Sequence, residues 1–414
     1  MPGAGPIRYD LGHFRRRPME AMVSTPRGWQ FFMHPGPTNI PQRVLQAMAR
    51  PAVDFTGAEF VALRDACLRR LRRILKSEAA TVVAYAASGN GAWEASIANL
   101  FSPGERVLVC ESGYFSRNWA ATAEAFGLQV EILPTSERAV VDVQALGAQL
   151  ARDAGHAIKA VLLVHNETST GMRHPVAEAR AVIDAVGHPA LFLVDTISSL
   201  ASYDFRMDEW GVDLVVGGAQ KGLMLPPGMS FTAANTKALA AAQAARNPRR
   251  YFDWRNMVKD GRQASFVGTA PMHFFYGLEV ALDMLEEEGL ENVFARHRRL
   301  AQATRACVDA WAAGGGPQVF PLERAYASDS LTAVLMPPGH DADRVRSIAE
   351  ARYGVALGRG LTTLQGRVFR IGHMGALNEP MLLGALAAIE LALRDAGVPF
   401  GRGGIEAAQA ALAA

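Results

Sequence analysis

Short runs of wholly apolar residues in the middle of the chain constrain its fold more than any other feature. In Ala160-Val161-Leu162-Leu163-Val164 every side chain is apolar, which is typical of a strand covered on both faces in a mainly parallel sheet. Ala-rich stretches of helical length separate the runs, so the pattern predicts βαβ units and an open α/β sheet. The candidate strands are Thr81–Tyr85, Arg106–Cys110, Gln129–Leu133, Ala160–Val164, Ala190–Val194, Leu214–Val216 and Ser230–Ala233.

The pattern changes after about residue 280. A charged helical stretch over Leu285–Leu300 precedes the break at Gly314-Gly315-Gly316-Pro317, and two strand candidates follow at Leu331–Met336 and Val368–Ile371. A chain of 414 residues is also too long for one ordinary hydrophobic core. We therefore predict an N-terminal arm at 1–30, a large α/β domain at 31–285 and a smaller α+β C-terminal domain at 286–414.

Charge and cysteine content exclude several classes of protein. The formal net charge of +2 rules out a strong whole-chain field for nucleic acid or an anionic membrane. Cys67, Cys110 and Cys307 are isolated in sequence, so we expect neither a disulfide framework nor a metal site. We find no apolar stretch long enough to span a bilayer, and the first thirty or so residues lack the apolar region of a signal peptide. A cytoplasmic setting is the default expectation.

Two of the predicted strands end in turns that suit a ligand, since open α/β sheets bind ligands at the carboxyl ends of their strands. Ser88-Gly89-Asn90-Gly91 precedes a helical run, whose free N–H groups attract anions. His165-Asn166-Glu167-Thr168-Ser169-Thr170-Gly171 follows a buried strand. Either segment is equally compatible with ordinary turn and capping chemistry.

Two ionisable residues follow other strands. Asp195 leaves an entirely apolar run, where a carboxylate is costly to bury unless it caps a helix or pairs with a cation such as a ring nitrogen. Lys221 is the only charged residue in the stretch from 215 to 228. If this stretch is buried, the pKa of the lysine falls and its neutral amine can form an imine with an aldehyde. The alternative is a lysine whose ammonium group reaches solvent from a loop.

Together these features match one cofactor, pyridoxal phosphate, which has a phosphate, a basic ring nitrogen and an aldehyde. Asp195 would keep the ring nitrogen protonated, so that the ring withdraws electrons from the substrate α-carbon. Lys221 would move the α-proton as a general base. Phe115, in Gly113-Tyr114-Phe115, could stack on the ring or belong to the ordinary core.

Several long collinear motifs give the chain a family resemblance. From about Phe31 to its C-terminus it resembles the class V aminotransferases of fold type I, most closely the serine–glyoxylate and alanine–glyoxylate group. The motifs are Pro35-Gly36-Pro37-Thr38-Asn39-Ile40, Ser88-Gly89-Asn90-Gly91-Ala92-Trp93-Glu94-Ala95, Asn166-Glu167-Thr168-Ser169-Thr170-Gly171, Asp204-Phe205-Arg206-Met207-Asp208-Glu209-Trp210-Gly211, Gln220-Lys221-Gly222, Gly289-Leu290-Glu291-Asn292-Val293-Phe294-Ala295-Arg296-His297 and Phe369-Arg370-Ile371-Gly372-His373.

The resemblance implies roles for individual residues. Lys221 is the Schiff-base lysine, Asp195 the partner of the pyridine nitrogen, and Arg370 the arginine that binds the substrate α-carboxylate, a role that suits a planar guanidinium. Thr269 matches a phosphate contact that the neighbouring subunit supplies, which implies a homodimer with shared sites. The predicted cofactor-binding set is Ser88, Gly89, Asn90, Phe115, Thr168, Asp195, Ile197, Gln220, Lys221 and Thr269. The predicted substrate-binding set is Arg370, Phe55, Thr56 and Asn39.

The sequence departs from the family pattern in three places, one of which is Thr196, where relatives usually have a small residue after the aspartate. Relatives that use glyoxylate commonly read Asp-His-Arg where this chain has Asp54-Phe55-Thr56, and tyrosine is frequent at the position of Phe266. The segments Arg370-Ile371-Gly372-His373-Met374-Gly375 and Gly404-Ile405-Glu406-Ala407-Ala408 also resemble pyridoxamine–pyruvate aminotransferase. These departures bear on the choice of amino donor and leave the imine chemistry untouched.

The expected function is a ping-pong aminotransferase. A small amino acid such as serine or alanine would leave its amine on the cofactor, and a small 2-oxo acid such as glyoxylate or pyruvate would collect it. The alternatives are a pyridoxamine–pyruvate-type enzyme that uses the free vitamer, a non-transaminating pyridoxal-phosphate enzyme, or a cofactor-binding regulator. We expect no nucleic-acid or membrane partner.

Overall fold

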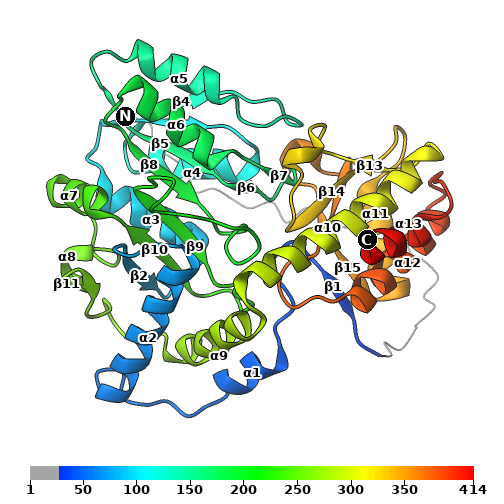
Figure 1. Ribbon diagram of the computed structural model, residues 1–414, viewed down its shortest axis with the longest axis horizontal. Coiled ribbons are helices and arrows are strands. Elements are labelled where there is room, and N and C mark those ends of the chain that lie inside the picture. The colour runs from blue at the N-terminus through cyan, green and yellow to red at the C-terminus, as the bar shows by residue number, and fades with distance from the viewer. Residues whose placement is uncertain (1–27) are drawn as a thin grey trace, which may run out of the picture.

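The structure, a computed structural model, describes residues 28–414, so nearly all of the arm predicted at 1–30 lies outside the described residues. Two lobes are visible, the larger one around a seven-stranded sheet and the smaller one around a five-stranded sheet (Figure 1). The α/β class predicted from the sequence is confirmed.

The sheet of the larger lobe has the strand order β2-β10-β9-β8-β5-β3-β4. All neighbouring strands run parallel except β10, which is antiparallel to both β2 and β9. Each strand lies within two residues of its predicted range. The bounds are β2 Thr81–Tyr85, β3 Arg106–Cys110, β4 Gln129–Leu133, β5 Ile158–Val164, β8 Leu191–Asp195, β9 Leu214–Gly218 and β10 Ser230–Ala234.

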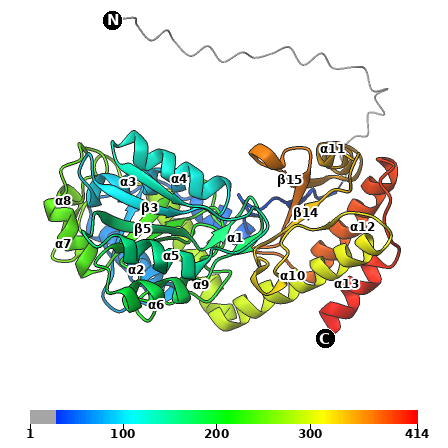
Figure 2. The same ribbon diagram turned by 90° about the horizontal axis from the view of Figure 1, so that it is seen from above.

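Helices cover both faces of this sheet, which explains why its strands are apolar at every position. In β5, Val161 and Leu163 face a core built with α2, α5, α6 and α9, whereas Leu162 faces a second core built with α3, α4 and α7. Figure 2 shows α3 and α4 above the strands and α2, α5, α6 and α9 below them. The bounds are α2 Ala58–Ile74, α3 Gly89–Leu100, α4 Tyr114–Ala125, α5 Val143–Arg152, α6 Val176–Val186, α7 Thr236–Ala244 and α9 Met272–Glu288.

The sheet of the smaller lobe has the order β1-β15-β16-β14-β13 and packs on a core of its own. Its first strand, β1, comes from the N-terminal side of the chain and pairs in parallel with β15. Phe31–Met33 therefore lies in the sheet of the C-terminal lobe, although the prediction assigned these residues to the large domain. The bounds are β1 Phe31–Met33, β13 Gln318–Val319, β14 Leu331–Leu335, β15 Val355–Arg359, β16 Val368–Gly372, α10 Leu290–Ala313, α11 Ala342–Tyr353, α12 Glu379–Asp395 and α13 Gly404–Ala413.

A glycine separates the helices that join the lobes. Gly289 has a φ of +82°, and it ends α9 and begins α10 within the stretch that the sequence predicted as one helical segment. The short elements that remain are α1 Gln42–Met48, α8 Trp254–Met257, β6 Asn166–Glu167, β7 Met172–Arg173, β11 Val258–Lys259 and β12 Arg262–Gln263. Within residues 28–414, no helix is both long and apolar enough to cross a membrane.

Candidate active site

A cavity of about 230 Å³ opens where β5, β8 and β9 end and α3 begins. Nine of the ten residues in the predicted cofactor-binding set line it. They are Ser88, Gly89, Asn90, Phe115, Thr168, Asp195, Ile197, Gln220 and Lys221. Residues that lie more than 130 positions apart in the sequence thus meet at one edge of the sheet, as the rule for open α/β folds predicts.

Lys221 lies in the turn that follows β9, and its side chain points into the cavity. Its Nζ donates a hydrogen bond to the carbonyl oxygen of Pro35 at 2.6 Å. Burial, reinforced by the positive charge of Arg370, lowers the pKa of Lys221 to about 7. The backbone of Gly36 passes so close that a Cβ there would overlap the lysine side chain. Because its pKa is lowered in this way, part of the Lys221 amine is neutral and nucleophilic near pH 7.

Asp195 is the last residue of β8, and two donors hold its carboxylate in place. Oδ1 accepts from the backbone N–H of Ile197 at 2.7 Å, and Oδ2 accepts from the indole Nε1 of Trp93 at 2.8 Å. Burial raises the pKa of Asp195 to about 7. A cation in the cavity would favour the ionised carboxylate, which is the arrangement that a protonated ring nitrogen requires.

The start of α3 provides a site for an anion. Ser88 is the N-cap residue, yet its hydroxyl makes no capping hydrogen bond, and the first N–H groups of the helix are without partners inside it. A Cβ on Gly89 would lie 2.5 Å from the Cδ1 atom of Ile197, so a larger residue there would displace the Ile197 side chain from the cavity wall. The amide oxygen of Gln220 is buried and has no hydrogen-bond partner among the described residues. An amide oxygen can only accept, so it is the amide N–H groups of the Gln220 side chain, together with the helix terminus, that suit a phosphate group.

Phe115 forms an aromatic wall, and Glu167 fixes its position. The Phe115 ring lies edge-on to Trp93, with ring centroids 6.4 Å apart. The buried carboxylate of Glu167 accepts the backbone N–H groups of Phe115 at 3.1 Å and Ser116 at 3.3 Å, at the beginning of α4. It also accepts from the hydroxyl of Ser169 at 2.6 Å. Burial raises the pKa of Glu167, while these donors act in the opposite direction.

Arg370 brings a buried cation from β16 of the smaller lobe. Its Nε donates to the carbonyl oxygen of Arg359 at 2.8 Å, and its Nη1 donates to the carbonyl oxygen of Thr168 at 2.9 Å. Burial lowers the pKa of Arg370 to about 10, so the side chain remains charged at neutral pH. No carboxylate within residues 28–414 forms an ion pair with it. Arg370 does not itself line the cavity, but its bond to Thr168, which does, places a guanidinium with unused N–H groups next to it, and such a group suits a substrate carboxylate.

The other predicted residues do not line the cavity in the single chain. Asn39 donates to the carbonyl oxygen of Phe32 at 3.0 Å, and half-buried Phe55 packs on the main core. Thr56 is exposed and bonds to Asp54. Thr269 is also exposed. Their roles toward a substrate or a neighbouring subunit remain predictions.

Trp93, Asn166 and Ser198 line the same cavity, and the sequence reasoning assigned them no role. Trp93 follows Gly89 by four residues and so lies on the same face of α3, a spacing that could have identified it. Ser198 accepts from the Thr168 hydroxyl at 2.8 Å and from the Asn166 side-chain amide at 2.9 Å. Neither hydrogen bond could be predicted from the sequence, because each joins residues on separate turns.

Comparisons with known proteins agree with this geometry. The family model described as Aminotransferase class-V matches residues 30–376. The serine–glyoxylate aminotransferase of Methylorubrum extorquens is 41% identical over 398 residues, which cover 94% of this chain and 98% of that protein. The L-aspartate–glyoxylate aminotransferase of Paracoccus denitrificans is 40% identical over 376 residues, covering 91% and 94%. The crystal structure of an alanine–glyoxylate aminotransferase from Nostoc sp. superposes with a TM-score of 0.82 at 30% identity, covering 90% and 97%.

The extent of these matches confirms both the family resemblance and the fold type I architecture that the sequence predicted. The family model spans the larger lobe and reaches through β16 of the smaller one. The chain belongs to the class-V aminotransferase family.

Proposed function

We propose that the chain uses pyridoxal phosphate to move the amino group of a small amino acid to glyoxylate or a similar 2-oxo acid. The observation that carries this proposal is the cavity itself. The buried amine of Lys221, the carboxylate of Asp195 and the N-terminus of α3 all lie around it. An amine, a carboxylate and an anion site are what the aldehyde, the ring nitrogen and the phosphate of this cofactor need.

In this proposal each part of the cavity holds one part of the cofactor. Ser88, Asn90 and Gln220 bind the phosphate at the start of α3, and Phe115 packs on the ring. Asp195 keeps the ring nitrogen protonated, and Trp93 and the Ile197 N–H hold the carboxylate in position. Pyridoxal phosphate, when bound, supplies a ring that withdraws electrons from the substrate α-carbon.

Lys221 has two roles. Its neutral amine would hold the cofactor by condensing with the aldehyde and releasing water, which is possible near pH 7 because its pKa is lowered to about 7. Once a substrate amine had replaced it, the freed amine would accept the proton from the substrate α-carbon and, as its conjugate acid, deliver it back. Arg370 binds the α-carboxylate of the amino acid and so directs the α-hydrogen toward Lys221.

The choice of substrates rests on the relatives. Those of Methylorubrum and Paracoccus are named for serine or aspartate as the donor and for glyoxylate as the acceptor. We extend glyoxylate to this chain as the acceptor, with a small amino acid as the donor. Exposed Thr269 fits the role of a phosphate contact to a second subunit, so we propose a homodimer. The three buried free cysteines suit a reducing cytoplasmic setting.

A panel of half-reactions tests the proposal. The protein loaded with pyridoxal phosphate is mixed with serine, alanine, aspartate, glycine or free pyridoxamine, and the loss of the visible absorbance of the bound cofactor is followed. We expect one or more small amino acids to remove it and glyoxylate to restore it. If none of the amino acids removes it, the proposed reaction is wrong. If no amino acid removes it but the cofactor-free protein converts free pyridoxamine and pyruvate to pyridoxal and alanine, the enzyme is of the pyridoxamine–pyruvate type.

A further inference from the structure

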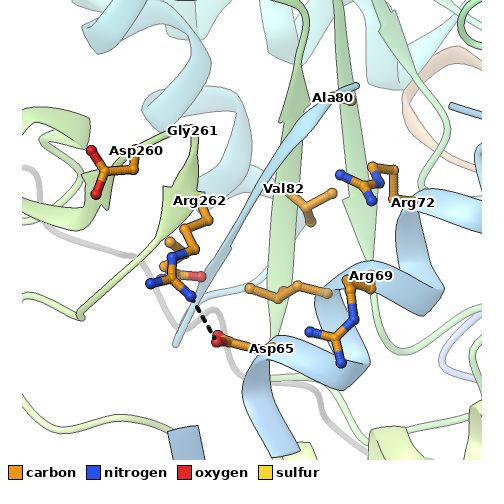
Figure 3. A pocket seen from close by; sticks show the side chains of 10 residues that line it. Asp65, Arg69, Arg72, Ala80, Val82, Asp260, Gly261 and Arg262 are labelled. Atoms are coloured by element: carbon orange, nitrogen blue, oxygen red, sulfur yellow. Dashed lines mark ion pairs between the residues drawn. The ribbon is translucent and has the colours of Figure 1, made fainter. Parts of the chain in front are cut away.

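A second cavity, of about 270 Å³, lies between α2, the beginning of β2 and the β11–β12 hairpin (Figure 3). It shares no lining residue with the active-site cavity. Ala80 and Val82 place it at the amino end of β2, whereas the active site lies at the carboxyl ends of the strands. Nothing in the proposed reaction uses this end of the sheet.

Three arginines surround this cavity, and two of them lack a counter-charge. Arg69 and Arg72 lie three residues apart on α2, so both emerge on the face toward the hairpin. Within residues 28–414, neither forms an ion pair. Two other arginines of the same helix are fully engaged: Arg64 pairs with Asp65 at 2.7 Å, and Arg70 pairs with Asp283 at 2.8 Å. Arg69 and Arg72 thus bring two unpaired positive charges to the cavity, whereas Arg73, which also forms no ion pair within residues 28–414, does not line it.

The third arginine, Arg262, belongs to the β11–β12 hairpin, whose position is fixed by its own tight turn and by a hydrogen bond to β2. Asp260 and Gly261 form the turn of the hairpin with φ angles of +52° and +71°, as in the tight two-residue turns that Asp-Gly favours. The hydroxyl of Thr81 donates to the carbonyl oxygen of Gly261 at 2.8 Å and fixes the turn to β2. Arg262 itself lies 3.6 Å from Asp65. The hairpin is therefore held in place before any ligand arrives.

The two carboxylates near the cavity do not neutralise it. Asp65 is shared between Arg64 and Arg262, and Figure 3 shows the Asp260 side chain pointing away from the arginines. Buried Leu68 and Val82 provide an apolar floor. Planar guanidinium groups bind phosphate and carboxylate oxygens in pairs. We propose that this cavity binds a small organic anion with at least two negative charges, either a phosphate ester or a polycarboxylate.

Calorimetric titration of the cofactor-loaded protein tests the proposal. The probes are inorganic pyrophosphate and citrate, and sodium chloride at equal ionic strength is the reference for screening. The variants are the double variant Arg69→Ala/Arg72→Ala and, as a matched control, Arg73→Ala. Arg73 is an exposed arginine of the same helix that does not line the cavity. Because anions also reach the active site, only binding that differs between these variants counts.

We expect at least one probe to bind the wild type and Arg73→Ala equally, and to bind the double variant about tenfold more weakly or not at all. Preference for pyrophosphate identifies phosphate esters as the natural class, and preference for citrate identifies polycarboxylates. Arg262→Gln should weaken binding independently, so the test does not depend on one variant folding. The proposal is overturned if neither probe binds beyond the chloride reference, or if the double variant binds like the control.

Discussion

The wall of the active-site cavity and the two surface segments predicted to approach it differ in how they are held. Lys221 and Asp195, which line the cavity, and Arg370, which bonds to the lining residue Thr168, are at most 7% exposed, and partners from other elements fix all three. Thr56 and Thr269 are exposed, and Thr56 bonds only to its near neighbour Asp54. In the proposed function the buried residues of one chain carry out the amine chemistry, and the exposed segments are the ones proposed to reach a substrate or a second subunit. Substitutions of the buried residues should therefore reduce activity far more than substitutions of the exposed ones.

Lys221→Ala should have the largest effect. It removes both the amine that bonds to the cofactor and the base that moves the α-proton, so kcat should fall by about 10⁴-fold or more. The visible absorbance of the covalently held cofactor should disappear as well. Lys159→Ala, which alters an exposed lysine, is the control. Near-normal turnover by Lys221→Ala would remove the main support for the proposed chemistry.

Arg370→Ala should weaken donor and acceptor together, by roughly 2–5 kcal/mol in kcat/KM for each half-reaction, because it removes a desolvated carboxylate partner. Binding of the cofactor should change little. Arg367→Ala removes an exposed arginine from the same segment and should leave both half-reactions unaltered. An effect on only one substrate would mean that Arg370 does not anchor the carboxylate that amino donor and oxo acid have in common.

Trp93→Phe tests whether the indole positions Asp195. The loss of one hydrogen bond to a carboxylate should cost about 1.5–3 kcal/mol, or roughly 10- to 100-fold in kcat/KM. Trp119→Phe is a matched control, because Trp119 stacks on Trp93 at 6.2 Å and its own Nε1 has no partner among the described residues. Equal losses in the two variants would indicate a packing effect only.

The pKa of Lys221 predicts a pH profile. Because burial lowers this pKa to about 7, the neutral amine predominates above pH 7 and the ammonium below it. The rate of covalent cofactor attachment to the cofactor-free protein should rise about tenfold from pH 6 to pH 8 and then level off. Arg370→Ala should move the midpoint upward, since the charge of Arg370 contributes to the lowered pKa. A rate that keeps rising to pH 10 would indicate an ordinary, solvated lysine.

Thr56→Ala should have the smallest effect, less than about threefold in kcat/KM for any donor, since exposed positions rarely contribute more than 0.5 kcal/mol. The test is to measure kcat/KM of this variant with every amino donor of the panel. A selective loss for one donor would show that this segment reaches a substrate, most directly across the interface of the proposed dimer.

The strands of the larger sheet could be predicted because their signal is local. Ala160–Val164 is apolar at every position, and the structure buries this strand from both sides. The glycine-rich turn at Ser88 and the isolated Lys221 could also be recognised from the local sequence alone. Their meeting in one cavity follows from the rule that parallel strands bring their carboxyl ends to the same edge.

Features that depend on distant partners could not be predicted in this way. β1 is three residues long and is a strand only because it pairs with β15. Glu167 reads in the sequence as a polar turn residue, but tertiary packing makes it the acceptor at the start of α4. The hydrogen bond from Trp93 to Asp195 joins residues 102 positions apart. Local pattern carries no information about such pairs.

The pairing of β1 with β15 has a consequence for biosynthesis. Phe31–Met33 is synthesised well before its partner Val355–Arg359, so the two strands cannot pair until the later segment has been made. At about 5–20 residues per second, roughly 320 residues of synthesis separate the two, which amounts to some tens of seconds. During that interval the larger lobe can form. The sheet of the smaller lobe cannot be completed, because its edge strand β1 still has no β15 to pair with. Arg370, which follows β15 in the chain, is synthesised after every residue that lines the active-site cavity, so the proposed carboxylate anchor can join that cavity only once it has formed.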